Sequence, residues 1–313
     1  MADLVAALER AFAAGPGDSR VLGLDAPGGT FHVKVATHAA PATPGGDSRP
    51  VFVAKVNANF PGNPAAGLPT IQGVAALFDA RDGTLLALLD SPELTARRTG
   101  AATAVAARRM ARAGARSLLL CGCGRQAAAQ LEAVSTVLGI DRLTVCDLDS
   151  ARAERFAGEA TLRYGLAVAV ARHPSETSRE HDLIVTCTSA RGPILGRADV
   201  APGTFLAAVG ADHPTKQELD PALVAAARLV VDARASAAAS GELHHALEAG
   251  FAGLAERAAE LGEVVRGERP GRANAEEITL FDSTGIALED AAAALVAYER
   301  ARRSGAPVCD FGS

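Results

Sequence analysis

Short apolar runs alternate with helical patterns from about Ser117 to about Gly285. Runs of this kind, separated by polar or helix-periodic segments, are typical of strands that are buried on both faces. The expected strands begin with SLLLC at Ser117 and continue at Leu143–Cys146, Ala167–Ala171, Asp182–Cys187, Thr204–Val209, Arg228–Asp232 and Ile278–Asp282. Strands that alternate with helices predict an α/β fold, with a doubly wound parallel sheet and helices on both of its faces.

The first hundred or so residues follow a different pattern. Their expected strands are Phe31–Ala36, Val51–Val56 and Ala75–Asp79, with Gly/Pro-rich turns at Ala40–Pro50 and Pro61–Pro69 and a hairpin turn at Arg81–Thr84 before LLALL. This pattern predicts a second, smaller α+β domain with a mixed or antiparallel sheet. A helix at Thr99–Ala113 would lead into the parallel-sheet domain, and a last helix at Ala287–Arg303 would return to the first. The expected domains are therefore residues 1–105 with 287–313, and residues 106–286.

A glycine-rich turn follows the first strand of the parallel sheet, in the segment SLLLCGCGRQ. Gly122 permits a tight turn, Gly124 lets backbone N–H groups approach a phosphate, and Ala127 is small enough for the helix to pack on the strand. That helix, expected at about Gln126 to Leu138, would point its positive dipole end at the phosphates, with Arg125 and Gln126 at its start. The pattern predicts a Rossmann-type dinucleotide site.

An acidic residue stands where an adenosine ribose would be bound. Asp147 ends the second expected strand, about 20 residues after the turn, where a carboxylate accepts hydrogen bonds from the ribose hydroxyls. No basic residue follows it directly, and a carboxylate would repel a 2′-phosphate, so NAD is expected rather than NADP. Arg152 or Arg155 could weaken that preference by turning toward the phosphate. Asp147 could instead be a solvated strand end or a helix cap.

Polar residues follow several other strands of the predicted parallel sheet. The carboxyl ends of parallel strands meet at one edge, where ligands bind in open α/β sheets. The further residues expected near the cofactor are Thr186, Thr188, Val209, Ser283 and Thr284, and Asp212 lies at the same edge.

Composition and charge exclude several classes of protein. The net charge of −5 and the lack of a basic run argue against a nucleic-acid partner. No apolar run reaches the ~18 residues of a membrane span, and the N-terminal segment has the pattern of an amphipathic helix rather than of a signal peptide. Three of the five cysteines, Cys121, Cys146 and Cys187, stand in apolar strand contexts and are expected to be core residues in a reducing, cytoplasmic compartment.

No metal site is expected from the spacing of histidines and cysteines. Cys121 and Cys123 lack a second pair at zinc-site spacing. His244 and His245 are adjacent on a probable helix, so their side chains are expected to point to different faces and to make a poor ligand pair.

Basic residues interrupt the apolar pattern of the first domain. Lys55 lies inside VFVAKVN, either extending to solvent from an edge strand or directed at an anion. Lys34 in FHVKV is a weaker case. Arg98 follows LTAR at the expected entry to a helix, where it could hold a carboxylate or simply be an exposed first-turn residue.

Five segments in order resemble the successive conserved blocks of the ornithine cyclodeaminase and mu-crystallin family. They are VFVAKVNANFPGNPAAGLPTIQG, LTARRTGAATAVAARRMA, LLLCGCGRQAAAQL, FLAAVGADHPTKQELD and ITLFDSTGIALED, and the resemblance extends from about Arg20 to Asp290. It implies hydride exchange between a nicotinamide cofactor and the α-carbon of an amino or imino acid, in a homodimer. The family includes ornithine and lysine cyclodeaminases, an archaeal-type alanine dehydrogenase, ketimine reductases and opine-like amino-acid dehydrogenases.

The resemblance also implies roles for individual residues. Lys55 and Arg98 match positions that hold the substrate carboxylate, and Arg20 matches a third across a divergent stretch. Asp212 matches the acid/base carboxylate beside the reacting nitrogen, a sensible place for it because an imine accepts hydride better when protonated. His32 appears where cyclodeaminases carry a substrate-facing glutamate, unless the alignment slips by two residues.

Three functions follow from these residues. The first is an NAD-dependent reductase of an α-imino or cyclic imino acid, or the reverse dehydrogenase, and His32 favours it because an imidazole cannot replace a carboxylate that pairs with an ammonium group. The second is an ornithine cyclodeaminase that converts ornithine to proline and ammonia with recycled NAD. The third is a nucleotide-dependent binding protein of the mu-crystallin type, which the presence of Lys55, Arg98 and Asp212 argues against.

Overall fold

The computed structural model describes residues 1–15, 17–39 and 49–305, and its chain divides into two compact units. The parallel-sheet unit comprises Met1–Val5 and Thr99–Ile286. The antiparallel-sheet unit comprises Ala6–Arg98 and the chain from Ala287 onward. Helices α1 (Ala2–Ala14) and α2 (Ser91–Met110) each carry the chain from one unit into the other.

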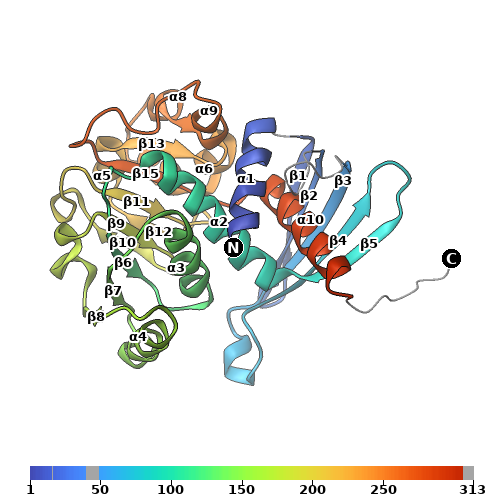
Figure 1. The fold of residues 1–313 in the computed structure, drawn as a ribbon, viewed down its shortest axis with the longest axis horizontal. Coiled ribbons are helices and arrows are strands. Elements are labelled where there is room, and N and C mark those ends of the chain that lie inside the picture. Colours follow the sequence, from blue (N-terminus) through green and yellow to red (C-terminus); the bar gives the residue numbers. More distant parts are fainter. Residues whose placement is uncertain (16, 40–48, 306–313) are drawn as a thin grey trace. The chain divides into compact units, whose positions relative to one another are not determined.

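The parallel-sheet unit is built on one sheet whose strands all run the same way (Figure 1). In spatial order its strands are β14 (Ala259–Glu260), β13 (Arg228–Val231), β15 (Thr279–Asp282), β11 (Phe205–Ala208), β9 (Leu183–Thr186), β6 (Ser117–Cys121), β7 (Arg142–Cys146) and β8 (Val168–Val170). The chain winds outward in both directions from β6 and β9, so the order reverses between these two strands. The expected doubly wound α/β sheet is confirmed.

Helices connect the parallel strands. They are α3 (Arg125–Val137), α4 (Ser150–Tyr164), α5 (Pro221–Ala226), α6 (Arg234–Ser240), α7 (Glu242–Glu248), α8 (Leu254–Arg257) and α9 (Leu261–Val265). The second half of α2 also belongs to this unit and packs very closely on α3. A Cβ on Gly100 would lie 2.5 Å from the carbonyl oxygen of Ala129, so only glycine permits that approach.

Two short strands of this unit were not expected from the sequence. β10 (Arg191–Leu195) and β12 (Gln217–Leu219) pair with each other in parallel, outside the main sheet. Both are short, and β10 contains Pro193, so neither carries a strong strand pattern. They shape the segments that follow β9 and β11, where the expected site residues Thr188 and Asp212 lie.

The antiparallel-sheet unit has a five-stranded meander. Its strands β1 (Ser19–Ala26), β2 (Gly29–His38), β3 (Val51–Asn59), β4 (Ile71–Asp79) and β5 (Leu85–Asp90) pair in sequence order (Figure 1). Helix α10 (Ala287–Arg303) packs on β2 and β3, as its return to the first domain implied. The hairpin turn at Arg81–Thr84 is confirmed, and Asn63–Ala66 in the second expected turn forms a 3₁₀ helix. Residues 40–48 of the first expected turn lie outside the described residues.

Two expectations for this unit were wrong. Strand β1 was missed, because its residues SRVLGLDA are almost all exposed and lack an apolar alternation. The helix expected at Thr99 begins at Ser91, eight residues earlier. Pro92 stands at the start of this helix, where a missing N–H costs nothing, and the chain reaches Arg98 only after two helical turns.

Within the ranges that the structure describes, no helix combines the length and the apolar character that a membrane-crossing segment requires.

Candidate functional site

The glycine-rich turn has the expected geometry. Gly122 has a φ of 94°, a left-handed conformation that favours glycine, and its Cβ would lie 2.8 Å from the carbonyl oxygen of Cys187. Gly124 precedes the first residue of α3, and a Cβ built on it would meet nothing within 4 Å. The backbone of this turn is therefore open on the side from which a phosphate would approach the start of the helix.

Asp147 follows β7 and is bound to that turn. Its Oδ2 accepts a hydrogen bond from the backbone N–H of Cys123 at 2.8 Å, and its Oδ1 accepts one from Asp149 at 2.9 Å. The helix cap of α4 is Asp149 rather than Asp147. Arg152 does turn toward Asp147, with its Nη1 3.6 Å from Oδ1, which is the arrangement that could weaken a preference for NAD.

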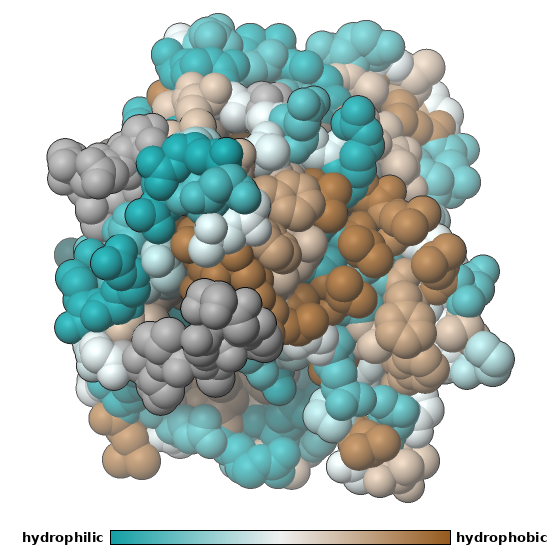
Figure 2. All heavy atoms as spheres, turned by 90° about the vertical axis from the view of Figure 1, so that its right-hand side faces the viewer, coloured by the Kyte–Doolittle hydropathy of each residue, from teal (hydrophilic) through white to brown (hydrophobic). Residues whose placement is uncertain are grey.

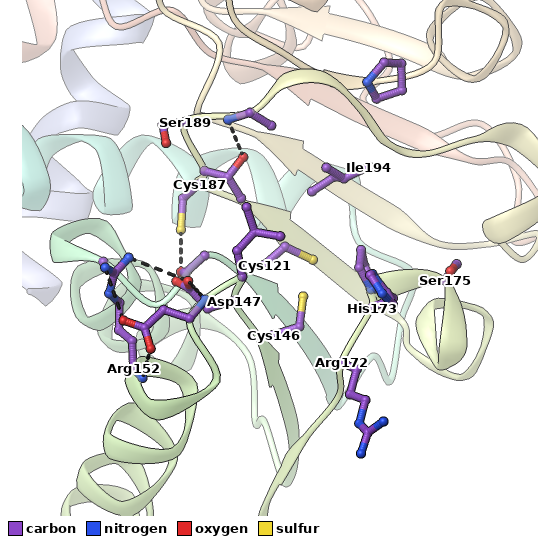
Figure 3. Close-up of a pocket in the computed structure, with 18 residues that line it drawn as sticks. Cys121, Cys146, Asp147, Arg152, Arg172, His173, Ser175, Cys187, Ser189 and Ile194 are labelled. Carbon is purple, nitrogen blue, oxygen red and sulfur yellow. Dashed lines mark hydrogen bonds and ion pairs between the residues drawn. The ribbon is translucent and has the colours of Figure 1, made fainter. Parts of the chain in front are cut away.

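A cavity of about 720 Å³ lies at the carboxyl ends of β6, β7 and β9 (Figure 3). This is the point where the strand order reverses, and its volume suits a cofactor or substrate. Four of the expected cofactor residues line it, namely Gly122, Gly124, Asp147 and Thr188. The same cavity is lined by Arg172 and His173, which follow β8 and which sequence reasoning missed. They could have been found by applying the strand-end rule to Ala167–Ala171 as well.

The other expected cofactor residues lie outside the lining of this cavity. They are Arg125, Gln126, Ala127, Thr186, Val209, Ser283 and Thr284. Several of them are engaged in internal hydrogen bonds: Thr186 donates to Glu218 at 2.8 Å, for example, and the backbone N–H of Thr284 donates to Asp232 at 2.7 Å. A strand-end position brings a polar side chain to the right edge of the sheet, but it does not decide which way that side chain turns.

Glu218 is a buried carboxylate that organises this edge, and sequence reasoning missed it. It accepts hydrogen bonds from the side chain of Thr186, from the backbone and side chain of Thr188, and from the backbone of Gly210. Burial raises the pKa of Glu218, and these hydrogen bonds work in the opposite direction. Glu218 thereby ties the segment after β9 to the segment that carries Asp212.

Asp212 lies in the loop between β11 and β12. Its side chain is 54% exposed, and its Oδ1 forms an ion pair with Lys216 Nζ at 2.6 Å. The carboxylate is thus accessible, as a residue that exchanges a proton with a substrate must be.

Lys55 and Arg98 meet in the antiparallel-sheet unit, in a buried charge cluster with two acids of α10. Lys55 Nζ lies 2.7 Å from Asp290 Oδ1 and 3.2 Å from Thr95 Oγ1. Arg98 contacts Glu289 Oε2 at 2.6 Å and Asp290 Oδ1 at 3.1 Å.

The structure decides between the alternatives for both cations. Lys55 is on β3, the central strand, and only 2% of its side chain is exposed, so extension to solvent from an edge strand is excluded. Arg98 is buried within α2, so it is not an exposed first-turn residue. The acids Glu289 and Asp290 were not expected as partners, although two adjacent acids inside the alanine-rich start of α10 are a signal of buried ion pairs.

The electrostatics of this cluster are dominated by burial. Burial lowers the pKa of Lys55 to about 8, even though Asp290 attracts its charge and raises the pKa. Burial alone would raise the pKa of Asp290, but the charges of Lys55, Arg98 and Lys34 outweigh it and hold that pKa below its ordinary value. The cluster therefore contains a lysine that can lose its charge in mildly alkaline solution.

Strand register separates the three remaining substrate-site candidates. Lys34 pairs with Lys55 across β2 and β3, and His32 is two residues away, so both project from the same face of the sheet as Lys55. His32 Nε2 lies 3.1 Å from Thr30 Oγ1. Arg20 pairs with Val35, one residue out of step, so it projects from the opposite face, and the structure does not bring it to Lys55.

The cysteines of the parallel-sheet unit are free thiols. Cys121 and Cys146 are buried as expected, but with the half-buried Cys187 they also line the cavity, and Figure 3 shows their sulfur atoms near it. Burial raises the pKa of Cys123 to about 12, and a hydrogen bond from Cys121 lowers that of Cys146.

The expectation that His244 and His245 point to different faces was wrong. Their ring centroids are 5.1 Å apart, and ligand atoms of both rings lie within 4.8 Å of each other and of a carboxylate oxygen of Glu248.

Comparison with known proteins agrees with this geometry. Residues 32–305 match the model of the ornithine cyclodeaminase/mu-crystallin family. The chain is 39% identical to an alanine dehydrogenase of Archaeoglobus fulgidus over 243 residues, which cover 78% of this chain and 74% of the relative.

Two solved structures share the whole fold. One is an archaeal alanine dehydrogenase dimer with bound NAD, with 34% identity, a TM-score of 0.91 and coverage of 99% of this chain and 95% of the other. The second is a Δ(1)-pyrroline-2-carboxylate reductase of Thermococcus litoralis in complex with NADH and L-proline, with 29% identity, a TM-score of 0.88 and coverage of 98% and 95%. The chain belongs to the ornithine cyclodeaminase/mu-crystallin family.

Proposed function

We propose that this protein is an NAD-dependent enzyme that reduces a cyclic or open-chain α-imino acid to the amino acid, or catalyses the reverse dehydrogenation. The observation that carries the proposal is the pair of buried cations, Lys55 and Arg98, in a chain whose other unit has a nucleotide-type cavity. With Lys34, three cations act on the two acids of this cluster, and the excess of positive charge is suited to a carboxylate ligand. Membership of the family, with relatives named as an alanine dehydrogenase and a pyrroline-carboxylate reductase, supports the same chemistry.

The residues of the cavity fit a dinucleotide. The open backbone at Gly124 and the start of α3 suit the pyrophosphate, and the carboxylate of Asp147 suits the ribose hydroxyls. We therefore assign residues 106–286 as the dinucleotide-binding domain and NAD as its cofactor. When bound, the nicotinamide supplies or accepts the hydride at the α-carbon.

The other roles fall to side chains of this chain. Lys55 and Arg98 would hold the substrate carboxylate, with Lys34 adding positive charge on the same face of the sheet. Asp212 would hold or deliver the proton at the imine nitrogen, because a protonated imine is the better hydride acceptor. Lys216 Nζ lies 2.6 Å from Asp212 Oδ1 and so holds this carboxylate in place.

His32 argues for net reduction over cyclodeamination. It lies on the same strand face as Lys34 and Lys55 and hydrogen-bonds to Thr30. An imidazole offers no carboxylate to pair with the distal ammonium group of ornithine, so a diamine substrate would lack a partner at this position.

The antiparallel sheet offers a surface for a homodimer. Leu22, Leu24, Phe31, Val74 and Leu88 lie on one face of this sheet by strand register, opposite Lys55, and each is more than one-third exposed. Figure 2 displays the brown, apolar surface in this part of the molecule. A contiguous apolar patch on a sheet is typical of a subunit interface, and we assign residues 1–105 with 287–313 as the substrate and dimerisation domain.

The test is NADH consumption upon addition of Δ1-pyrroline-2-carboxylate, with its six-membered ring homologue and NADPH in parallel. Stoichiometric loss of NADH supports the proposal. Loss with neither ring, combined with ammonia release from ornithine at catalytic NAD, would replace it with cyclodeamination. Binding of NADH without turnover of any of these substrates would replace it with a binding role.

A further inference from the structure

Helix α7 carries two histidines and a glutamate that converge on one point. His244 Nε2 lies 3.5 Å from Glu248 Oε2, and His245 Nδ1 lies 3.8 Å from the same oxygen. On a helix with about 100° per residue, Glu248 falls about 40° around from His244, between the two histidines. This explains why adjacent histidines share a site: the glutamate one turn later lies between them.

The outer nitrogen of each ring is bonded to a backbone carbonyl. His244 Nδ1 lies 3.1 Å from the carbonyl oxygen of Ala238 in α6, and His245 Nε2 lies 2.8 Å from that of Lys216. A carbonyl oxygen only accepts, so these nitrogens carry the protons. In each neutral ring the other nitrogen, His244 Nε2 or His245 Nδ1, then has its lone pair free of hydrogen and directed toward the Glu248 carboxylate.

Fixed tautomers of this kind are characteristic of metal-bound histidines. A ligating imidazole almost always donates its second N–H to a carbonyl or carboxylate, which sets the ring orientation and increases its basicity. Here both rings already have such a partner, supplied by two different segments of the chain. The positions of the two rings are therefore fixed by the segments packed around α7 and not by the helix alone.

We propose that His244, His245 and Glu248 form a binding site for a divalent transition metal ion such as Zn²⁺. Two imidazoles and one carboxylate favour zinc, nickel or copper over magnesium or calcium, which prefer oxygen ligands. In a tetrahedral zinc site with bonds of 2.0–2.1 Å, ligand atoms are about 3.3 Å apart. The present separations are all within 4.8 Å, so a shift of no more than about 1.5 Å completes the site. Glu248 is 66% exposed and can make that shift, leaving a fourth position for water.

The site is separate from the cofactor cavity and from the residues proposed for catalysis. None of its three ligands lines that cavity. It is linked to the loop of Asp212, because the carbonyl that orients His245 belongs to Lys216, whose side chain pairs with Asp212. A bound ion would hold α7, α6 and this loop together, which is a positioning role.

The proposal is tested with Zn²⁺ on the full-length protein, first treated with a chelator and then titrated in competition with a chromophoric chelator. One zinc ion per chain is expected. His244→Asn and His245→Asn should each weaken binding on the order of 100-fold, and Glu248→Gln at least about 10-fold. Matched controls are Glu256→Gln on α8 and His213→Asn, which should bind zinc as the unchanged protein does.

Co²⁺ identifies the ligands independently. Co²⁺ bound to nitrogen and oxygen ligands should show visible absorption bands but no near-ultraviolet charge-transfer band of the kind that a cobalt thiolate gives. The visible bands should be lost in His245→Asn. Thermal unfolding in the presence of a chelator checks that each variant is folded. Absence of binding, binding unchanged in the His244→Asn/His245→Asn double variant, or a thiolate band would each overturn the proposal.

Discussion

Lys55 should impose an alkaline limit on substrate capture. Burial lowers its pKa from 10.5 to about 8, which corresponds to about 3 kcal/mol against the charged form at 1.36 kcal/mol per unit. Below pH 8 the side chain is charged and can attract a carboxylate, and above pH 8 it is neutral. The charged fraction falls from about ten-elevenths at pH 7 to about one-eleventh at pH 9, so kcat/KM should fall about tenfold over that interval.

Replacing Lys55 by methionine should weaken substrate binding and abolish the dependence of kcat/KM on pH between pH 7 and pH 9. A charged hydrogen bond contributes about 1.5–3 kcal/mol, so kcat/KM at pH 7 should fall roughly 10- to 150-fold. Its decline between pH 7 and pH 9 should disappear. Lys55→Arg keeps a charge at all these pH values and should also lack the decline, although its planar, bulkier head will reduce the rate.

The assay is the initial rate of NADH oxidation with Δ1-pyrroline-2-carboxylate from pH 6.5 to 9.5. NADH affinity, measured by fluorescence titration, should stay within about twofold in Lys55→Met, because the cofactor cavity lies in the other unit of the chain. A decline that persists in Lys55→Met would belong to the substrate imine or to another group, and a wild-type profile flat to pH 9 would refute the reasoning.

The unfolding free energy shows whether Lys55→Met loses activity through substrate binding or through a damaged fold. Lys55→Met leaves Arg98, 3.1 Å away, as a cation in direct contact with the buried carboxylate of Asp290, and should lower the unfolding free energy by up to about 3 kcal/mol. The double variant Lys55→Met/Asp290→Asn removes both charges and should recover much of the melting temperature without recovering KM. If KM recovered together with stability, the effect of Lys55→Met would be structural.

Three further outcomes follow from the proposed site. Asp212→Asn should reduce kcat by about 10²- to 10⁴-fold while NADH titrates as before, and wild-type turnover would remove Asp212 from the mechanism. Asp147→Asn retains an oxygen that can accept from Cys123 but loses the charge, so the ratio of kcat/KM for NADPH to that for NADH should rise at least about tenfold; an unchanged ratio would mean that Arg152 already cancels the carboxylate. Leu22→Glu on the apolar sheet face should shift sedimentation velocity toward monomer, whereas Leu162→Glu on α4, an even more exposed leucine outside that face, should not.

Local sequence determined much of this protein. The apolar runs and the Gly122–Gly124 turn specify a parallel sheet with a dinucleotide-type edge, because buried strands and tight turns have strong short-range requirements. Alternation along FHVKV and VFVAKV indicates which residues of each strand share a face, whereas the pairing of Lys34 with Lys55 is given by the folded sheet. The family could be recognised for the same reason, since its blocks are these local segments.

Other features were decided only by the tertiary structure. A strand-end rule could not tell that Thr188 lines the cavity while Thr186 does not, nor that both side chains donate to Glu218, because this buried carboxylate comes from another strand. The burial of Lys55 as a charged side chain depends on its ion pair with Asp290, which is 235 residues away in the chain.

The convergence of His244 and His245 on Glu248 could likewise not be predicted from the fact that the histidines are adjacent, because backbone carbonyls of two other segments orient the two rings. Periodicity and turn chemistry act over a few residues and can be read from the sequence. The partners of buried charges and of imidazole rings are chosen by packing between segments, and only the folded chain brings those together.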